Sequence, residues 1–164
     1  MSTPSQSTQA PAALFLLDTN VLLRLSERAS PMHATARQAI ANIYHAGNVP
    51  LITAQNLIEF WSVATRPIEN NGLGLSAAQA AAEIEKHKAA FRLLPDAPNV
   101  LTFWETLALR YNVQGAQVHD ARLAAVALAY QVPNFLTFNG RHFARFAPEG
   151  LAVIDPANVP IPQT

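Results

Sequence analysis

Three of the eleven acidic residues lie within or beside apolar segments of the sequence, where a carboxylate is unusual and calls for an explanation. Asp18 directly follows the apolar run of residues 13–17, and Glu59 lies in the middle of the segment 57–61. Asp120 stands at the start of a segment that is almost entirely apolar. A buried carboxylate is costly unless it is paired or bound to a metal, and three at one site raise each other's pKa values. A hard divalent cation relieves both effects, so oxygen ligands of this kind suit Mg²⁺ or Mn²⁺.

Each acid also has an ordinary structural explanation, which the sequence leaves open. Aspartate is a good N-cap, so Asp18 and Asp120 could each cap the first turn of a helix. Glu59 could pair with Arg66 or point to water. A cap does not explain an acid in the middle of a helix, whereas a metal site explains all three acids together.

The segments around these acids alternate between strand and helix patterns. Apolar runs of strand length predict buried strands at residues 13–17 and 49–53. Shorter, mainly apolar segments predict further strands at residues 92–95, 135–138 and 151–154. Helical spacing predicts helices at residues 19–27, 32–46, 55–65, 77–91, 99–111 and 121–130. This alternation is typical of a three-layer α/β domain with a mainly parallel sheet. In such sheets ligands bind at the carboxyl ends of the strands, which is where Asp18 stands.

Composition excludes several classes of protein. The chain has no cysteine, which excludes disulfides, thiolate metal sites and a cysteine nucleophile. Eleven basic residues balance eleven acidic ones, so net charge alone does not indicate nucleic-acid binding. No apolar run reaches the length of a membrane span. We therefore predict a protein of the cytoplasm that has no membrane partner.

The length of 164 residues predicts one domain, which we place at residues 13–157. Residues 1–12 are uncharged and rich in Ser, Thr, Gln and Pro, which predicts a disordered N-terminal tail. Residues 158–164 would form a C-terminal tail.

Four motifs of the chain resemble those of PIN-domain ribonucleases. They are LDTNV at residues 17–21, Glu59 within its helix, HDARLAA at residues 119–125 and LTFN at residues 136–139. In order and spacing they are similar to the small VapC-type toxins of bacterial toxin–antitoxin systems, over about residues 14–154. The resemblance implies a PIN-like α/β fold with a parallel five-stranded sheet in the order 3-2-1-4-5, flanked by helices.

The resemblance also implies an activity, Mg²⁺- or Mn²⁺-dependent cleavage of RNA by an endoribonuclease. The catalytic, metal-binding acids of the family map onto Asp18, Glu59 and Asp120. Positions that support the metal site map onto four polar residues, Thr19, Asn20, Thr137 and Asn139.

The resemblance to these toxins also implies two kinds of partner. One is a cognate antitoxin that covers the site, and the other is a second copy of the chain in a homodimer. The antitoxin could dock on the apolar stripe of the first two helices, formed by Val21, Leu22, Leu25, Ala36 and Ile40. Packing in the core explains the same stripe.

The turn after the fourth strand departs from the family pattern. Many members carry a fourth acid there, whereas this chain has Asn139, Gly140, Arg141 and His142. Imidazole is a better ligand for Mn²⁺ than for Mg²⁺. If His142 joins the site, we expect one well-occupied cation at Asp18 and Asp120, and activity that favours Mn²⁺ and falls toward acid pH. Alternatively, His142 points away and packs on its short helix.

Several basic residues are candidates for contacts with RNA phosphates, because a planar guanidinium suits phosphate oxygens. Arg141 is the best placed, and the others are Arg24, Arg66, Arg122 and Arg145. Each could equally be an ordinary surface arginine. His119, next to Asp120, could act as a general acid or simply stand at the entry to a helix.

Two other functions fit part of this pattern. A phosphatase of the haloacid-dehalogenase type also places an aspartate after its first strand, but it needs a second one where this chain has Asn20. A catalytically degenerate PIN domain could act as an RNA- or protein-binding module. The intact trio of acids argues against that alternative.

Overall fold

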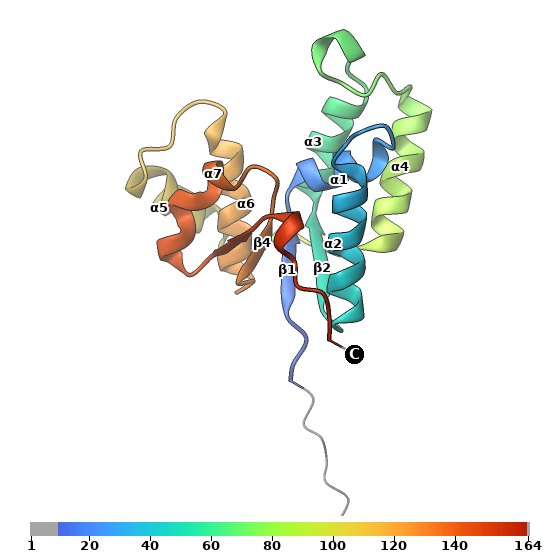
Figure 1. The fold of residues 1–164 in the computed structure, drawn as a ribbon. Helices are drawn as coiled ribbons and strands as arrows, with labels where there is room; N and C mark the ends of the chain where they lie inside the picture. Colours follow the sequence, from blue (N-terminus) through green and yellow to red (C-terminus); the bar gives the residue numbers. More distant parts are fainter. Residues whose placement is uncertain (1–9, 164) are drawn as a thin grey trace, which may run out of the picture.

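A computed structural model describes residues 10–163 of the chain (Figure 1). Most of the predicted N-terminal tail, residues 1–9, lies outside the described residues. Residues 10–13 lead into the first strand without forming a helix or a strand. Within the described range, no helix is both long enough and apolar enough to cross a membrane.

Five parallel strands form the sheet at the centre of the molecule. They are β1 (Leu14–Leu17), β2 (Val49–Thr53), β3 (Arg92–Leu94), β4 (Asn134–Leu136) and β5 (Ala152–Ile154). Their order in the sheet is β3-β2-β1-β4-β5, which confirms the expected topology. After β3 the chain returns to pair β4 with the free side of β1. The carboxyl ends of β1 and β4 therefore form a topological switch point, the usual place for a ligand in an open α/β sheet.

Helices cover both faces of the sheet (Figure 1). On one side lie α1 (Thr19–Ser26), α2 (His33–His45), α3 (Ala54–Ala64) and α4 (Ala77–Ala90). On the other lie α5 (Val100–Arg110), α6 (Gln117–Ala129) and α7 (Gly140–Phe143). Three short 3₁₀ turns complete the described chain: η1 (Ile68–Asn70), η2 (Ala144–Glu149) and η3 (Pro156–Asn158). The result is the three-layer α/β arrangement that the alternating pattern predicts.

The central strand shows why the apolar run before Asp18 has no polar gap. Side chains of a strand alternate between the two faces of the sheet. Leu16 packs into the core beneath α5, α6 and α7, whereas Phe15 and Leu17 pack into the core beneath α1 to α4. Leu16 and Leu17 are fully buried. A strand covered on both faces needs apolar residues at consecutive positions.

The helix that carries Asp120 begins earlier than we predicted. It starts at Gln117, with Ala116 at the N-cap, so Asp120 lies in the first turn and does not cap it. The turn before the helix is made at Gly115, whose positive φ of 55° suits glycine. The prediction that Asp120 opens this helix is therefore wrong, and capping does not explain this acid.

The apolar stripe that we considered as an antitoxin groove is mostly core. Val21, Leu22 and Ala36 are fully buried among the neighbouring helices and strands. Leu25 and Ile40 reach the wall of a surface cavity between α1, α2 and α4. Most of the stripe is therefore not available for docking. Only Leu25 and Ile40, at its outer edge, can contact a partner.

The chain stays in contact with the domain beyond residue 157. Val159 is buried, and its carbonyl oxygen accepts a hydrogen bond of 3.3 Å from the side-chain Nδ2 of Asn42 on α2. The boundary at residue 157 remains a prediction, but these contacts hold part of the expected C-terminal tail against α2.

Candidate metal centre

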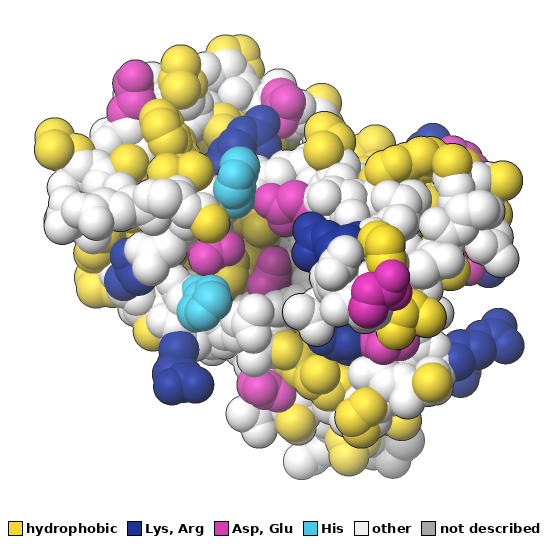
Figure 2. All heavy atoms as spheres, turned by 90° about the horizontal axis from the view of Figure 1, so that it is seen from above, with side chains coloured by type: hydrophobic (Ala, Val, Ile, Leu, Met, Phe, Trp, Pro, Cys, Tyr) yellow, Lys and Arg dark blue, Asp and Glu magenta, His cyan; other side chains and the backbone are white. Residues whose placement is uncertain are grey.

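The three acids come from different parts of the fold and meet at the carboxyl ends of the strands. Asp18 directly follows β1, Glu59 lies on α3 after β2, and Asp120 lies in the first turn of α6. Figure 2 looks down on this end of the molecule and shows acidic side chains in a central hollow, with histidine and basic side chains at its margin. The switch point predicted from the topology is therefore an acidic site.

Asp18 is buried, with 7 % of its surface exposed. It occupies the N-cap position of α1 but makes no side-chain capping hydrogen bond. Its Oδ2 instead accepts hydrogen bonds from Thr137 Oγ1 at 2.6 Å and from Asn20 Nδ2 at 2.8 Å. The carboxylate is thus held toward β4, and capping does not account for it.

The environment of Asp18 disfavours its negative charge. The pKa of Asp18 is raised from 3.8 to about 6, and burial is the largest cause. The nearby charges of Asp120 and Glu59 contribute to this rise, while the hydrogen bond from Thr137 opposes it. A buried carboxylate next to two others is the setting in which a cation stabilises the ionised form.

Glu59 is half-buried on α3 and is held through both carboxylate oxygens. Thr19 Oγ1 donates to Oε2 at 2.7 Å, and Gln55 Nε2 donates to Oε1 at 2.7 Å. Among the described residues no ion pair joins Glu59 to Arg66, which was one of the alternatives. The buried Asn56 links the same elements, because its Nδ2 donates to Thr19 Oγ1 and to the Leu17 carbonyl.

Asp120 lies at the opposite wall of the hollow, with 28 % of its side chain exposed. Burial raises its pKa, the charge of His142 opposes that rise, and the charge of Glu59 adds to it. His142 Nδ1 lies 3.5 Å from Asp120 Oδ2. His142 therefore faces the acids and does not pack away from them, although it is largely exposed.

The supporting residues form one hydrogen-bond network behind Asp18. Thr137 is fully buried, and its Oγ1 accepts from Asn20 Nδ2 at 3.2 Å and from the backbone N–H of Asn139 at 2.9 Å. Asn20 Oδ1 accepts from the backbone N–H of Phe138 at 3.3 Å. Asn139 thus contributes its backbone, while its side chain is exposed. The network fixes the end of β1 to the segment after β4.

The candidate phosphate contacts separate into engaged and exposed residues. Arg24 pairs with Glu27, Arg122 with Asp96 and Gln55, and Arg145 donates to Gln117. Arg66 is exposed beyond the end of α3. His119, the neighbour of Asp120 on α6, is exposed, and so is Arg141 on α7.

Sequence reasoning missed Gln55 and Asn56, which tie α3 to the strand end and to α6. A glutamine four residues before Glu59 lies on the same helix face, so the spacing was a usable signal for Gln55. The spacing of Thr53 and Asn56 was a usable signal for the capping box that they form at the start of α3. The bonds of Asn56 to Thr19 and Leu17 were not predictable from the local pattern, because those partners are on other elements.

The chemistry of the donors fits a hard divalent cation. Three carboxylates, a threonine hydroxyl and an asparagine amide are oxygen donors of the kind that Mg²⁺ and Mn²⁺ prefer. As the side chains stand in residues 10–163, no three His, Asp or Glu residues converge closely enough to hold an ion. Asp18 and Glu59 accept the hydrogen bonds described above, and Asp120 lies 3.5 Å from His142. Burial, with the charges of Asp120 and Glu59 beside it, raises the pKa of Asp18 and disfavours its ionised form.

Comparisons with known proteins agree with this fold. A family model described as the PIN domain matches residues 15–148. A search of curated proteins gives no match. Among solved structures, VapBC2 from Rickettsia felis bound to a promoter DNA fragment has a TM-score of 0.64 at 14 % identity, covering 87 % of this chain and 98 % of that one.

Two further solved structures are similar. VapBC-1 from nontypeable Haemophilus influenzae has a TM-score of 0.63 at 18 % identity, covering 88 % of this chain and 99 % of that one. VapC20 from Mycobacterium tuberculosis, described as a sarcin–ricin loop cleaving toxin, has a TM-score of 0.60 at 19 % identity. That match covers 79 % of this chain and 93 % of the other. At these identities the similarity concerns the fold.

Proposed function

The chain belongs to the PIN-domain family, and on this premise we propose that it is a metal-dependent endoribonuclease, the toxin of a type II toxin–antitoxin pair. The observation that carries the proposal is the meeting of Asp18, Glu59 and Asp120 at the switch point of the sheet. Burial and the two neighbouring acids together raise the pKa of Asp18 to about 6. Nucleases of this family hydrolyse phosphodiester bonds, which requires charge compensation at such a site.

Asp18 and Asp120 would hold Mg²⁺ or Mn²⁺ directly, and Glu59 directly or through water. When bound, such a cation supplies the positive charge that activates water and stabilises the phosphoryl oxygens. Asn20 and Thr137 hold Oδ2 of Asp18 in place by hydrogen bonds, and Thr19 does the same for Oε2 of Glu59. The expected products carry 3′-hydroxyl and 5′-phosphate ends.

RNA is the proposed substrate, and the margin of the hollow supports this choice. The charges of His142 and Arg145 both act on Asp120, and Arg141 is the neighbour of His142 on the short helix α7. A similar structure is described as a toxin that cleaves the sarcin–ricin loop. We propose that Arg141 contacts a phosphate next to the one that is cleaved.

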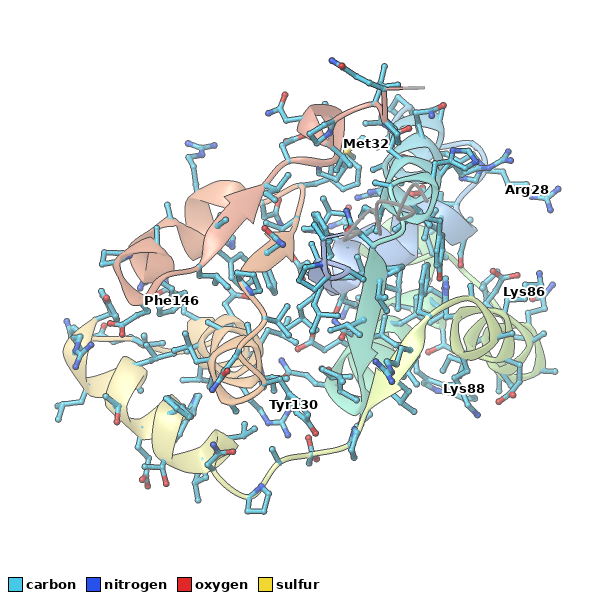
Figure 3. All side chains as sticks on the ribbon, turned by 90° about the horizontal axis from the view of Figure 1, so that it is seen from below. Arg28, Met32, Lys86, Lys88, Tyr130 and Phe146 are labelled. Carbon is cyan, nitrogen blue, oxygen red and sulfur yellow. The ribbon has the colours of Figure 1, made fainter. Side chains whose placement is uncertain are left out.

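An antitoxin is the proposed partner, and the cavity between α1, α2 and α4 is its proposed docking site. This cavity of about 690 Å³ has apolar walls that include Leu25, Ile40 and Phe91. Arg28 and Lys86 stand on this side of the molecule (Figure 3). An amphipathic segment with acidic side chains would match it, and the VapBC complexes among the similar structures support such a partner. The cytoplasm is the proposed location of both.

A homodimer is proposed through α3. Ile58 and Trp61 lie one turn apart on this helix, and 70 % and 39 % of their surfaces are exposed. An exposed apolar pair beside the acidic hollow suits contact with a second copy of the chain. Light scattering of the purified protein tests this, and a strict monomer at micromolar concentration would contradict it.

The enzymatic proposal is tested by cleavage of single-stranded RNA with purified protein. We expect cleavage with Mg²⁺ or Mn²⁺, none with EDTA, and none for the Asp18→Asn variant. Cleavage that survives chelation, or products with 2′,3′-cyclic phosphate, would overturn the mechanism. RNA binding without cleavage in any metal would instead support the alternative of a catalytically degenerate binding module.

A further inference from the structure

One buried side chain touches two walls of the acidic hollow and has no role in the function proposed above. Gln55 lies on α3, one turn before Glu59, and only 8 % of its surface is exposed. Its Nε2 donates to Glu59 Oε1 at 2.7 Å and to the carbonyl oxygen of His119 at 2.8 Å. His119 precedes Asp120 in the first turn of α6. One amide group therefore contacts Glu59 itself and the backbone next to Asp120.

Arg122 fixes which way this amide points. Its Nη1 donates to Gln55 Oε1 at 2.9 Å, and its Nη2 donates to Asp96 Oδ1 at 2.9 Å. A guanidinium has only donors, whereas a carboxylate and a backbone carbonyl have only acceptors. If the amide were reversed, its NH₂ would face Arg122 and its oxygen would face two acceptors. All hydrogen-bonding groups of the amide are satisfied in only one orientation.

We propose that Gln55 and Arg122 form a positioning bridge that sets the orientation of Glu59 and its spacing from Asp120 across the metal site. This inference rests on the proposed function, because it assigns these two residues a role in preparing the site for a cation. Gln55 and Arg122 do not bind the cation or the reacting atoms. They hold α3 and α6 at a fixed separation, and they hold the carboxylate of Glu59 in one rotamer.

A role of Arg122 through its charge and a role through its hydrogen bonds predict opposite changes in cation affinity when Arg122 is replaced. The two roles can therefore be distinguished by experiment. If Arg122 acted only as a nearby positive charge, the Arg122→Met variant would bind a cation more tightly. If it acts through the bridge, the variant binds the cation less tightly, because Glu59 loses its fixed orientation. Removal of residues that orient metal ligands typically weakens metal affinity by about 10- to 100-fold.

Arg145 provides the matched control. It also contributes positive charge near Asp120, and it also donates to a glutamine, Gln117 at 2.9 Å. It makes no contact with Gln55 or Glu59 in the described structure. The Arg145→Met variant should therefore bind Mn²⁺ as tightly as the wild-type protein or more tightly.

The experiment measures Mn²⁺ affinity of the full chain by isothermal titration calorimetry, for wild type and for Gln55→Met, Arg122→Met and Arg145→Met. Gln55→Met keeps the length of the side chain and removes its three hydrogen bonds. We expect dissociation constants at least about tenfold higher for the first two variants only. Wild-type affinity, or tighter binding, in either of these two variants would overturn the bridge.

A second measurement needs no metal and separates this inference from the proposed function. Arg122 and Glu59 share no direct contact, so they can be coupled only by charge attraction through space or by the hydrogen bonds of Gln55. In a double-mutant cycle of urea unfolding with EDTA, Arg122→Met and Glu59→Gln should be coupled by about fivefold in the unfolding equilibrium constant. The part of this coupling that the bridge carries should be lost in the Gln55→Met background, which leaves only the attraction of the two charges; a coupling unchanged in that background would overturn the bridge. If wild type binds no Mn²⁺, the proposed metal site fails, and the dependence of this coupling on Gln55 still decides whether the bridge exists.

Discussion

Neutralising Asp18 should make the metal-free protein more stable, although it removes a residue that we expect to be essential for activity. The pKa of Asp18 is raised from 3.8 to about 6, and burial is the largest cause. A tenfold change in proton affinity corresponds to about 1.4 kcal/mol, so the ionised carboxylate costs the folded state about 3 kcal/mol. The Asp18→Asn variant avoids this cost. Its amide oxygen can still accept the hydrogen bonds that Thr137 and Asn20 donate to Oδ2.

Because the pKa of Asp18 is higher in the folded state than in the unfolded state, the stability difference between wild type and variant depends on pH. Between pH 3.8 and about 6 the folded state binds more protons at Asp18 than the unfolded state does. The contribution of Asp18 to the free energy of unfolding therefore falls as pH rises through this interval, and it stays low above it. The variant carries no titrating group at this position. Its advantage over wild type should be about half-developed at about pH 5 and complete, at about 3 kcal/mol, by about pH 7.5.

The assay is urea unfolding in EDTA at these two pH values, for wild type and Asp18→Asn. Asp155→Asn is the matched control, because Asp155 is an exposed N-cap whose Oδ1 accepts from the backbone N–H of Ala157 at 2.8 Å. Asparagine caps as well as aspartate, so this control should change little. Added Mn²⁺ should stabilise wild type and leave Asp18→Asn unchanged. A variant that is no more stable than wild type at pH 7.5, or a difference that does not depend on pH, would refute the reasoning.

Three further changes probe the same site. Asp120→Asn should abolish RNA cleavage and raise the stability of the metal-free protein by about 1 kcal/mol, and retained cleavage would contradict its assigned role. Thr137→Val should lower the free energy of unfolding by about 1–3 kcal/mol, because its hydroxyl bonds Asp18, Asn20 and the Asn139 backbone. An unchanged free energy of unfolding in urea would show that these hydrogen bonds do not stabilise the fold. His142→Ala should reduce the preference for Mn²⁺ over Mg²⁺ in initial cleavage rates, since its Nδ1 lies 3.5 Å from Asp120 Oδ2, and an unchanged preference would remove it from the site.

Local patterns predict much of this fold because the chain places strong signals at its element boundaries. The strand at residues 49–53 and the helix that Ser76 caps were both expected where they occur. The strand order came from the resemblance to PIN domains, and the sheet confirms it. Asp18 was identified as a candidate because a carboxylate at the end of a buried apolar segment is energetically unfavourable, whatever fold the chain adopts.

Features that depend on packing between elements were not predictable in this way. We predicted the start of α6 too late in the chain, because Asp120 is a residue type that favours the N-cap position. The helix in fact begins at Gln117, directly after the turn at Gly115. The helix stripe that includes Val21 was open to two interpretations, because periodicity does not tell which neighbour covers a helix. The bridge between Gln55 and Arg122 exists only because α3 and α6 lie on opposite walls of one hollow.

The central claim is that Asp18, Glu59 and Asp120 together bind one divalent cation. The most direct measurement is an anomalous difference map from crystals of the full chain grown with Mn²⁺, beside crystals of Asp18→Asn grown in the same way. The account predicts one strong peak within coordination distance of Asp18 and Asp120 in the wild-type protein, and no peak there in the variant. A wild-type map without a peak at this position, or with manganese bound only elsewhere on the surface, would contradict it.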